Sequence, residues 1–218
     1  MLLYIFVGCY KTESKSEIVA RLGNESITKS EVAHWMLLEK ANVYSYFFRK
    51  YGVQDSDHFW TEKQGNEIPL EKLKAIVIER AKRCKVQQIL ALEKGITETA
   101  NFDEIMQDLE KVNAERKRKV DKGEPVYGPK QFTSRTYFSH VFDKMVLALK
   151  NELAIDELKP NNQQLKMLQE KLSDSSKDIT GFLTMQYVDT NYEAFIDSLT
   201  VGTTMEIDKK VYKTISIK

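Results

Sequence analysis

Hydrophobic positions along most of this chain recur at intervals of three and four residues, which is the period of an amphipathic helix. The pattern predicts helices over residues 28–51, 69–94, 102–119, 132–153 and 165–172. The 4 prolines and 9 glycines of the chain fall outside these stretches or at their ends, so little interrupts the expected helices. The sequence therefore predicts a mainly α protein.

A short stretch before the first helix has a different period. Hydrophobic side chains alternate along Ile18–Leu22, which predicts a strand, and Gly23-Asn24 supplies the positive φ that a tight turn needs. Thr28 then stands where a hydroxyl can cap the first helix, with Glu31 as its capping-box partner three residues on. We expect a strand, a turn and a capped helix start in these fourteen residues.

From Ile179 the period changes from helical to alternating. The pattern predicts a strand over 179–187, a short helix over 192–199, and a closing hairpin made of 205–207 and 211–217. This β-α-β-β segment is either a small α+β module or a sheet that borrows the strand Ile18–Leu22 as a partner. The expected fold class is thus mainly α with a small α+β part.

Composition and charge narrow the function. With 42% hydrophobic and 30% charged residues, the chain has the composition of a globular protein. Its 33 Lys+Arg against 32 Asp+Glu leave a net charge of +1, which gives no long-range field to gather phosphate, so no nucleic-acid partner is expected. No run of about 20 apolar residues occurs, so no transmembrane helix is expected.

The amino terminus is apolar up to a cysteine and polar directly after it. Phe6-Val7-Gly8-Cys9 resembles a bacterial lipobox, in which the cysteine receives diacylglycerol, although the consensus prefers Leu where Phe6 stands. The resemblance implies lipidation at Cys9 and a membrane anchor; the alternative is a short buried strand with an ordinary cysteine. The other cysteine, Cys84, falls in an apolar helical stripe and is expected to be an inert core thiol.

Two motifs resemble one protein family. The segment Ile18–Glu31 is similar to the opening V-A-x-V-N-G-x-x-I-T-x-x-E of the SurA/PrsA-type chaperones, and Gly95-Ile96-Thr97-Glu98 is similar to their A-x-x-x-G-I-x-x-T junction. The resemblance covers residues 18–160 and implies a SurA N-terminal-like helical chaperone domain there. Residues 1–17 would then be a lipoprotein signal remnant and tether, and 161–218 a small C-terminal module that the resemblance does not cover.

Many members of that family carry a parvulin prolyl isomerase domain, which needs facing histidines and a Gly-Gly-x-Leu-Gly-like segment. The residues after Pro160 contain neither. The three histidines, His34, His58 and His140, lie in separate segments without metal-ligand spacing, and no phosphate-binding glycine loop or nucleophile elbow occurs. We therefore expect no catalytic residue, no metal and no cofactor.

These features favour a membrane-anchored, extracytoplasmic lipoprotein chaperone that binds unfolded or extended segments of secreted polypeptides without catalysis. Two alternatives stay open: a foldase with a reduced parvulin-like C-terminal module, and a structural lipoprotein with one fixed partner. Aromatic rings crowd the first helix and the loop after it, and their number around one helix predicts that some are exposed as the client-binding surface. The candidate client-binding residues are Trp35, Tyr44, Phe47, Phe48, Tyr51, Phe59 and Trp60.

Overall fold

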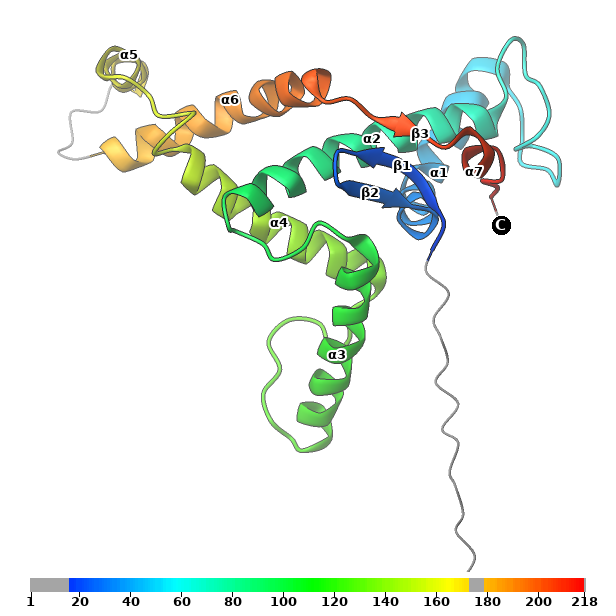
Figure 1. Cartoon of the computed structure of the whole chain (residues 1–218), viewed down its shortest axis with the longest axis horizontal. Coiled ribbons are helices and arrows are strands. Elements are labelled where there is room, and N and C mark those ends of the chain that lie inside the picture. The colour runs from blue at the N-terminus through cyan, green and yellow to red at the C-terminus, as the bar shows by residue number, and fades with distance from the viewer. Residues whose placement is uncertain (1–15, 173–178, 218) are drawn as a thin grey trace, which may run out of the picture.

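The computed structural model describes residues 16–172 and 179–217 (Figure 1). They form a mainly α protein with a small three-stranded antiparallel sheet, which confirms the prediction of a mainly α chain. The elements are β1 (Ile18–Leu22), β2 (Glu25–Thr28), α1 (Lys29–Tyr51), α2 (Pro69–Glu93), α3 (Phe102–Asp121), α4 (Ser134–Leu153), α5 (Asn162–Leu172), α6 (Thr180–Gly202), β3 (Glu206–Ile207) and α7 (Lys209–Lys213).

The strand, turn and helix start at the beginning of the described chain are confirmed. β1 and β2 form an antiparallel hairpin around Gly23, whose φ is 57°. The Thr28 hydroxyl accepts a hydrogen bond from the backbone N–H of Glu31 at 3.3 Å and so caps α1. The predicted return bond from the Glu31 carboxylate is wrong, because this side chain is fully buried and lies beside Lys85 instead.

α1 and α2 make the most extensive contact between two elements and carry the main core. α1 ends at Gly52, which adopts the left-handed conformation at φ 68° and donates its N–H to the carbonyl of Phe48. α2 begins at Pro69, a first helical position that needs no N–H donor. Phe59, from the loop between the two helices, is buried in the same core, so the loop is packed onto the helices.

α3 and α4 form a second helical layer, in which α3 extends away from the rest of the molecule (Figure 1). Asn101 caps α3 through its side-chain oxygen, and Thr133 and Thr136 form a reciprocal capping box at the start of α4. The loop between them contains Gly123, Pro125, Gly128 and Pro129, which prevent one continuous helix.

The strand predicted over 179–187 is wrong, because Thr180–Gly202 form the single helix α6. The helix predicted over 192–199 is confirmed, but it is only a part of this longer helix. Leu183, Val188, Tyr192 and Ile196 are its buried residues, spaced four or five residues apart. α6 packs on α2 and α4, and its Tyr192 hydroxyl donates to the side-chain oxygen of Gln87 at 2.8 Å. Burial against two helices therefore favours helix over the strand that the local alternation predicted.

The predicted strand over 211–217 is also wrong, because Lys209–Lys213 form α7, capped by Asp208. By contrast, the alternative in which the last segment borrows the strand Ile18–Leu22 is confirmed in its pairing. β3 adds to β1 antiparallel, with Ala20 opposite Ile207, and the sheet order is β2-β1-β3.

The division of the chain near Pro160 stays a prediction. None of the helices in the described ranges has the length and hydropathy to cross a membrane.

Candidate functional site

Three of the seven candidate client-binding residues lie in the core. Trp35, Phe47 and Phe59 are all buried, so these rings cannot contact a client on the folded protein. Tyr44, Tyr51 and Trp60 are half-buried, and Phe48 keeps 50% of its surface exposed. The structure therefore leaves four of the seven rings with surface that a ligand could reach.

Tyr51 also belongs to a hydrogen-bond network around Glu67. The Glu67 carboxylate accepts hydrogen bonds from the hydroxyls of Tyr46 and Tyr51 at 2.8 and 2.9 Å, and from the ammonium groups of Lys50 and Lys72 at 2.7 and 2.9 Å. The bond from Lys50, followed by that from Lys72, holds the pKa of Glu67 well below its usual range. This network fixes the end of α1 to the loop before α2.

One side of α1 carries a row of apolar residues that no other helix or strand within residues 16–172 and 179–217 covers. We call it the α1 face and define it as Ala33, Leu37, Ala41, Tyr44 and Phe48. These positions are three or four residues apart, so they share one side of the helix. Leu37 is 73% exposed, and the Tyr44 ring stacks on Phe48 with a centroid distance of 6.4 Å.

Two grooves run beside the α1 face. One, of about 570 Å³, lies between α1 and the last described residues, Thr214–Ile217. The other, of about 580 Å³, lies between α1 and the loop that carries Trp60. Leu37 and Ile217 line both grooves, so the two adjoin at these residues. Reasoning from aromatic residues missed Leu37 and Ile217; the helical spacing from Ala33 to Phe48 is the signal that could have found Leu37.

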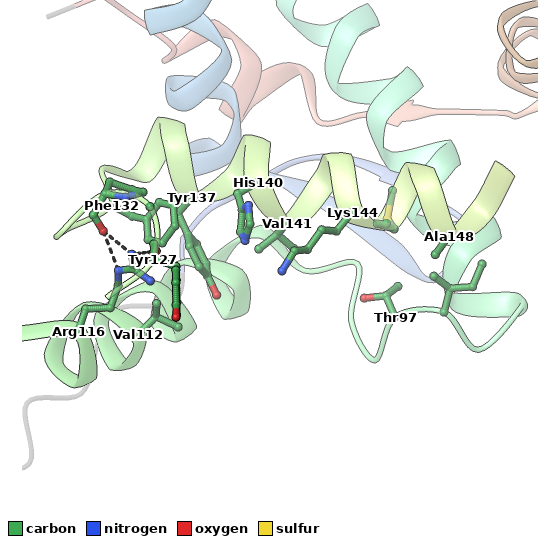
Figure 2. Close-up of a pocket in the computed structure, with 14 residues that line it drawn as sticks. Thr97, Val112, Arg116, Tyr127, Phe132, Tyr137, His140, Val141, Lys144 and Ala148 are labelled. Atoms are coloured by element: carbon green, nitrogen blue, oxygen red, sulfur yellow. Dashed lines mark hydrogen bonds between the residues drawn. The ribbon is translucent and has the colours of Figure 1, made fainter. Parts of the chain in front are cut away.

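A separate groove of about 610 Å³ lies between α3, α4 and the loop that joins them (Figure 2). We call it the α3–α4 groove. Val112 and Arg116 come from α3, Tyr127 and Phe132 from the loop, and several residues from α4. Sequence reasoning did not find this groove, because its walls come from segments with no shared motif; the only local signal was the loop rich in helix breakers.

A buried ion pair joins α1 to α2. The ammonium of Lys85 lies 3.1 Å from the carboxylate of Glu31, both side chains are fully buried, and Lys85 also donates to the carbonyl of Ala100. Burial raises the pKa of Glu31 to about 7, against the opposing effect of Lys85. Because neither side chain has exposed surface, the pair links α1, α2 and the segment before α3 and is out of reach of a ligand on the folded protein.

The histidines do not meet. His34 is buried against the rings of Trp35, Phe102 and Phe138, and burial lowers its pKa to about 4, with Arg135 acting in the same direction. His58 and His140 are exposed on other elements. Among residues 16–172 and 179–217, no group of three or more His, Cys, Asp or Glu side chains could hold a metal ion.

The structure describes only one of the two cysteines, Cys84. Cys84 is a free, buried thiol in α2, as predicted, and burial raises its pKa well above the usual value, which keeps it in the unreactive thiol form. Cys9, the predicted lipidation site, lies outside the described residues.

Comparison with known proteins gives no relative. No family model, no curated protein and no solved structure matches this chain.

Proposed function

We propose that this protein is a non-catalytic chaperone that binds unfolded or extended segments of secreted polypeptides on the α1 face. The observation that carries the proposal is the exposed apolar row along α1, beside which the two grooves lie. Soluble proteins rarely leave a continuous apolar surface open unless it binds a partner.

The dimensions and charges of the α1 face suit an extended chain. Ala33 and Phe48 are separated by roughly 22 Å along the helix, at about 1.5 Å per residue. This length matches about six or seven residues of extended polypeptide. Lys40, Asp55 and Asp57 line the groove beside it, so charges of both signs border the apolar surface and keep it soluble without selecting one charge on the client.

The motifs in the sequence support the same proposal. The hairpin and capped helix at Ile18–Glu31 have the pattern of the SurA/PrsA-type opening, and the segment after Pro160 lacks the histidines that a parvulin domain uses. In the described parts of that segment, the chain folds as α5, α6, β3 and α7. A binding role without isomerisation is therefore the function that we propose for the whole chain.

Replacing Leu37 and Phe48 together by Ser is expected to weaken suppression of client aggregation by about tenfold in the concentration required, because apolar contact at a central surface is lost. Both side chains are largely exposed, so the urea midpoint should change little. Light scattering of a chemically unfolded client, with the chaperone titrated in, measures the first quantity.

The control replaces Phe182 and Val201 by Ser, two exposed apolar residues on α6 that line neither groove of the α1 face. It should suppress aggregation like the parent protein. Equal suppression by the parent and the Leu37/Phe48 variant would exclude the α1 face as the client surface. Binding of one fixed protein, with no effect on several unfolded clients, would favour a structural lipoprotein instead.

We also propose that a lipid on Cys9 anchors the protein to a membrane outside the cytoplasm, on the strength of the lipobox-like Phe6-Val7-Gly8-Cys9. In bacteria that express the gene with its natural upstream sequence and are fed a labelled fatty acid, the parent protein should be labelled. Cys9→Ser should abolish the label, whereas Cys84→Ala, which alters a buried thiol, should keep it. Undiminished labelling of Cys9→Ser would refute the anchor.

A further inference from the structure

We propose that the α3–α4 groove binds an extended polypeptide segment in which acidic side chains stand next to bulky apolar ones. The inference rests on the proposed function in that the segment belongs to a client. It adds a second contact surface, which neither the motifs nor the aromatic rings predicted, and it gives that surface a preference for one charge.

The groove is held open by specific hydrogen bonds. Arg116 donates to the carbonyls of Pro129 at 2.9 Å and Tyr127 at 2.6 Å, and its guanidinium lies 4.8 Å from the Phe132 ring centroid. Asn113 pairs with both the N–H and the carbonyl of Phe132, each at 2.8 Å. Two α3 side chains thus fix the loop to α3. A binding surface shaped before the ligand arrives loses less entropy on binding.

The charges lining the groove are of one sign. Arg116 and Lys144 are cationic, and no aspartate or glutamate is among the described residues that line it. Lys144 is exposed and forms no ion pair within the described parts of the chain, so its charge is available to a ligand. Nearby Asp108 accepts a hydrogen bond from the Tyr137 hydroxyl and does not line the groove. An acidic group on the ligand would therefore be attracted.

The walls between these charges are apolar. Val112 from α3 and Val141 and Met145 from α4 line the groove, and the Phe132 ring stacks on His140 at a centroid distance of 5.4 Å. Bulky apolar side chains of a ligand would bury surface here, whereas a purely hydrophilic anion would not. The combination of cationic and apolar lining is what specifies an acidic and apolar segment.

The shape favours an extended chain over a compact ligand. Along α4 the lining runs from Tyr137 to Ala148, which spans roughly 16 Å of helix, or about five residues of extended polypeptide. Figure 2 shows Tyr127, Phe132 and Arg116 at one end of the groove, and Lys144, Thr97 and Ala148 toward the other. Tyr127 is 89% exposed at its end, where its ring can stack on an incoming side chain.

The test uses fluorescent seven-residue peptides that alternate Phe with Asp, Asn or Lys, and fluorescence anisotropy with the full chain at low salt. We expect the Asp peptide to bind about tenfold more tightly than the Lys peptide. Lys144→Glu should remove or invert that preference. Lys209→Glu is the matched control, since it makes the same charge change at an exposed position on α7, and it should keep the preference.

Tyr127→Ser should weaken all three peptides by about fivefold without moving the urea midpoint, because the ring is almost entirely in solvent. Equal affinities for the three peptides, or a preference unchanged in Lys144→Glu, would overturn the inference. So would binding of anionic phospholipid vesicles with no binding of the Asp peptide.

The result also separates this inference from the proposed function. Suppressed client aggregation without any charge preference among the peptides would refute the groove and leave the chaperone role. A charge preference that depends on Lys144, in a protein that fails to suppress aggregation, would keep the groove as a peptide site and refute the chaperone role.

Discussion

Replacing Lys85 by Met is expected to lower the free energy of unfolding by about 3–5 kcal/mol at pH 8, because it leaves the Glu31 carboxylate buried without its cation. The loss should be smaller at pH 5. Burial already raises the pKa of Glu31 to about 7, and removal of the Lys85 charge raises it further, so the carboxyl is neutral in the folded variant at acid pH.

The sign of the pH dependence follows from the raised pKa. A carboxyl whose pKa is higher in the folded protein contributes stability that is fully present below its unfolded value, near 4.5, and is lost as the pH rises through about 7. Urea unfolding at pH 5 and pH 8, followed by circular dichroism, measures the difference for the parent protein and for Lys85→Met.

Two controls test whether the loss of unfolding free energy comes from the Glu31 carboxylate that is left without a cation. Lys74→Met makes the same change at another buried lysine of α2, but the partner of Lys74, Glu71, is exposed, so the loss should be below about 1 kcal/mol. The double variant Glu31→Gln, Lys85→Met removes both charges and should recover much of the stability. A Lys85→Met loss that is equal at both pH values would contradict this account of the pair.

Phe47→Ala is expected to cost about 3–5 kcal/mol of unfolding free energy, because the ring has no exposed surface and packs against Tyr46, Tyr51 and Phe59. The neighbouring Phe48→Ala should cost below about 1 kcal/mol, since half of that ring is in solvent. Urea midpoints measure both. Adjacent residues of one type thus serve as each other's control.

The same pair also separates folding from binding. Phe48→Ala should weaken suppression of client aggregation, whereas Phe47→Ala, measured on its folded fraction, should not. If Phe48→Ala lost as much stability as Phe47→Ala, its ring would belong to the core and could not be part of the α1 face.

The ends of α1 to α4 could be predicted because local chemistry sets them. Thr28 accepts the hydrogen bond that starts α1, Gly52 takes the left-handed conformation that ends it, and Pro69 starts α2 where its missing N–H costs nothing. Glu31 shows the limit of this reasoning. Its position predicts a capping box, but its carboxylate pairs with the ammonium of Lys85 on α2. No local sequence pattern around Glu31 indicates that Lys85 lies beside it.

The first part of α6, where the alternating pattern predicts a strand over 179–187, could not be predicted from its own residues for a similar reason. Thr, Tyr and Val are frequent in Thr180–Gly202, and such residues favour strands when considered alone. The helix is favoured because residues of α2 and α4 pack against Val188, Tyr192 and Ile196 in one hydrophobic cluster. That cluster exists only after the earlier helices have packed, so tertiary contact decides the element.

The candidate site was predicted only in part. The abundance of rings around α1 correctly indicated exposed apolar surface, and Phe48 is one of its members. Which rings are exposed depends on where the loop that carries Phe59 and Trp60 packs on α1. The local sequence pattern does not predict the position of that loop. The α3–α4 groove depends on Asn113 and Arg116 binding backbone groups of a loop, and such contacts have no sequence signature.

The pairing of β3 with β1 imposes an order on folding during synthesis. β1 is made near the start of the chain, and its second neighbour, β3, is made near the end, so the backbone groups along one edge of β1 stay unpaired until Glu206 and Ile207 have left the ribosome. Closing such a long loop is entropically slow compared with forming the hairpin. Throughout that interval the nascent chain presents an open strand edge, which is a site where another chain could pair with it.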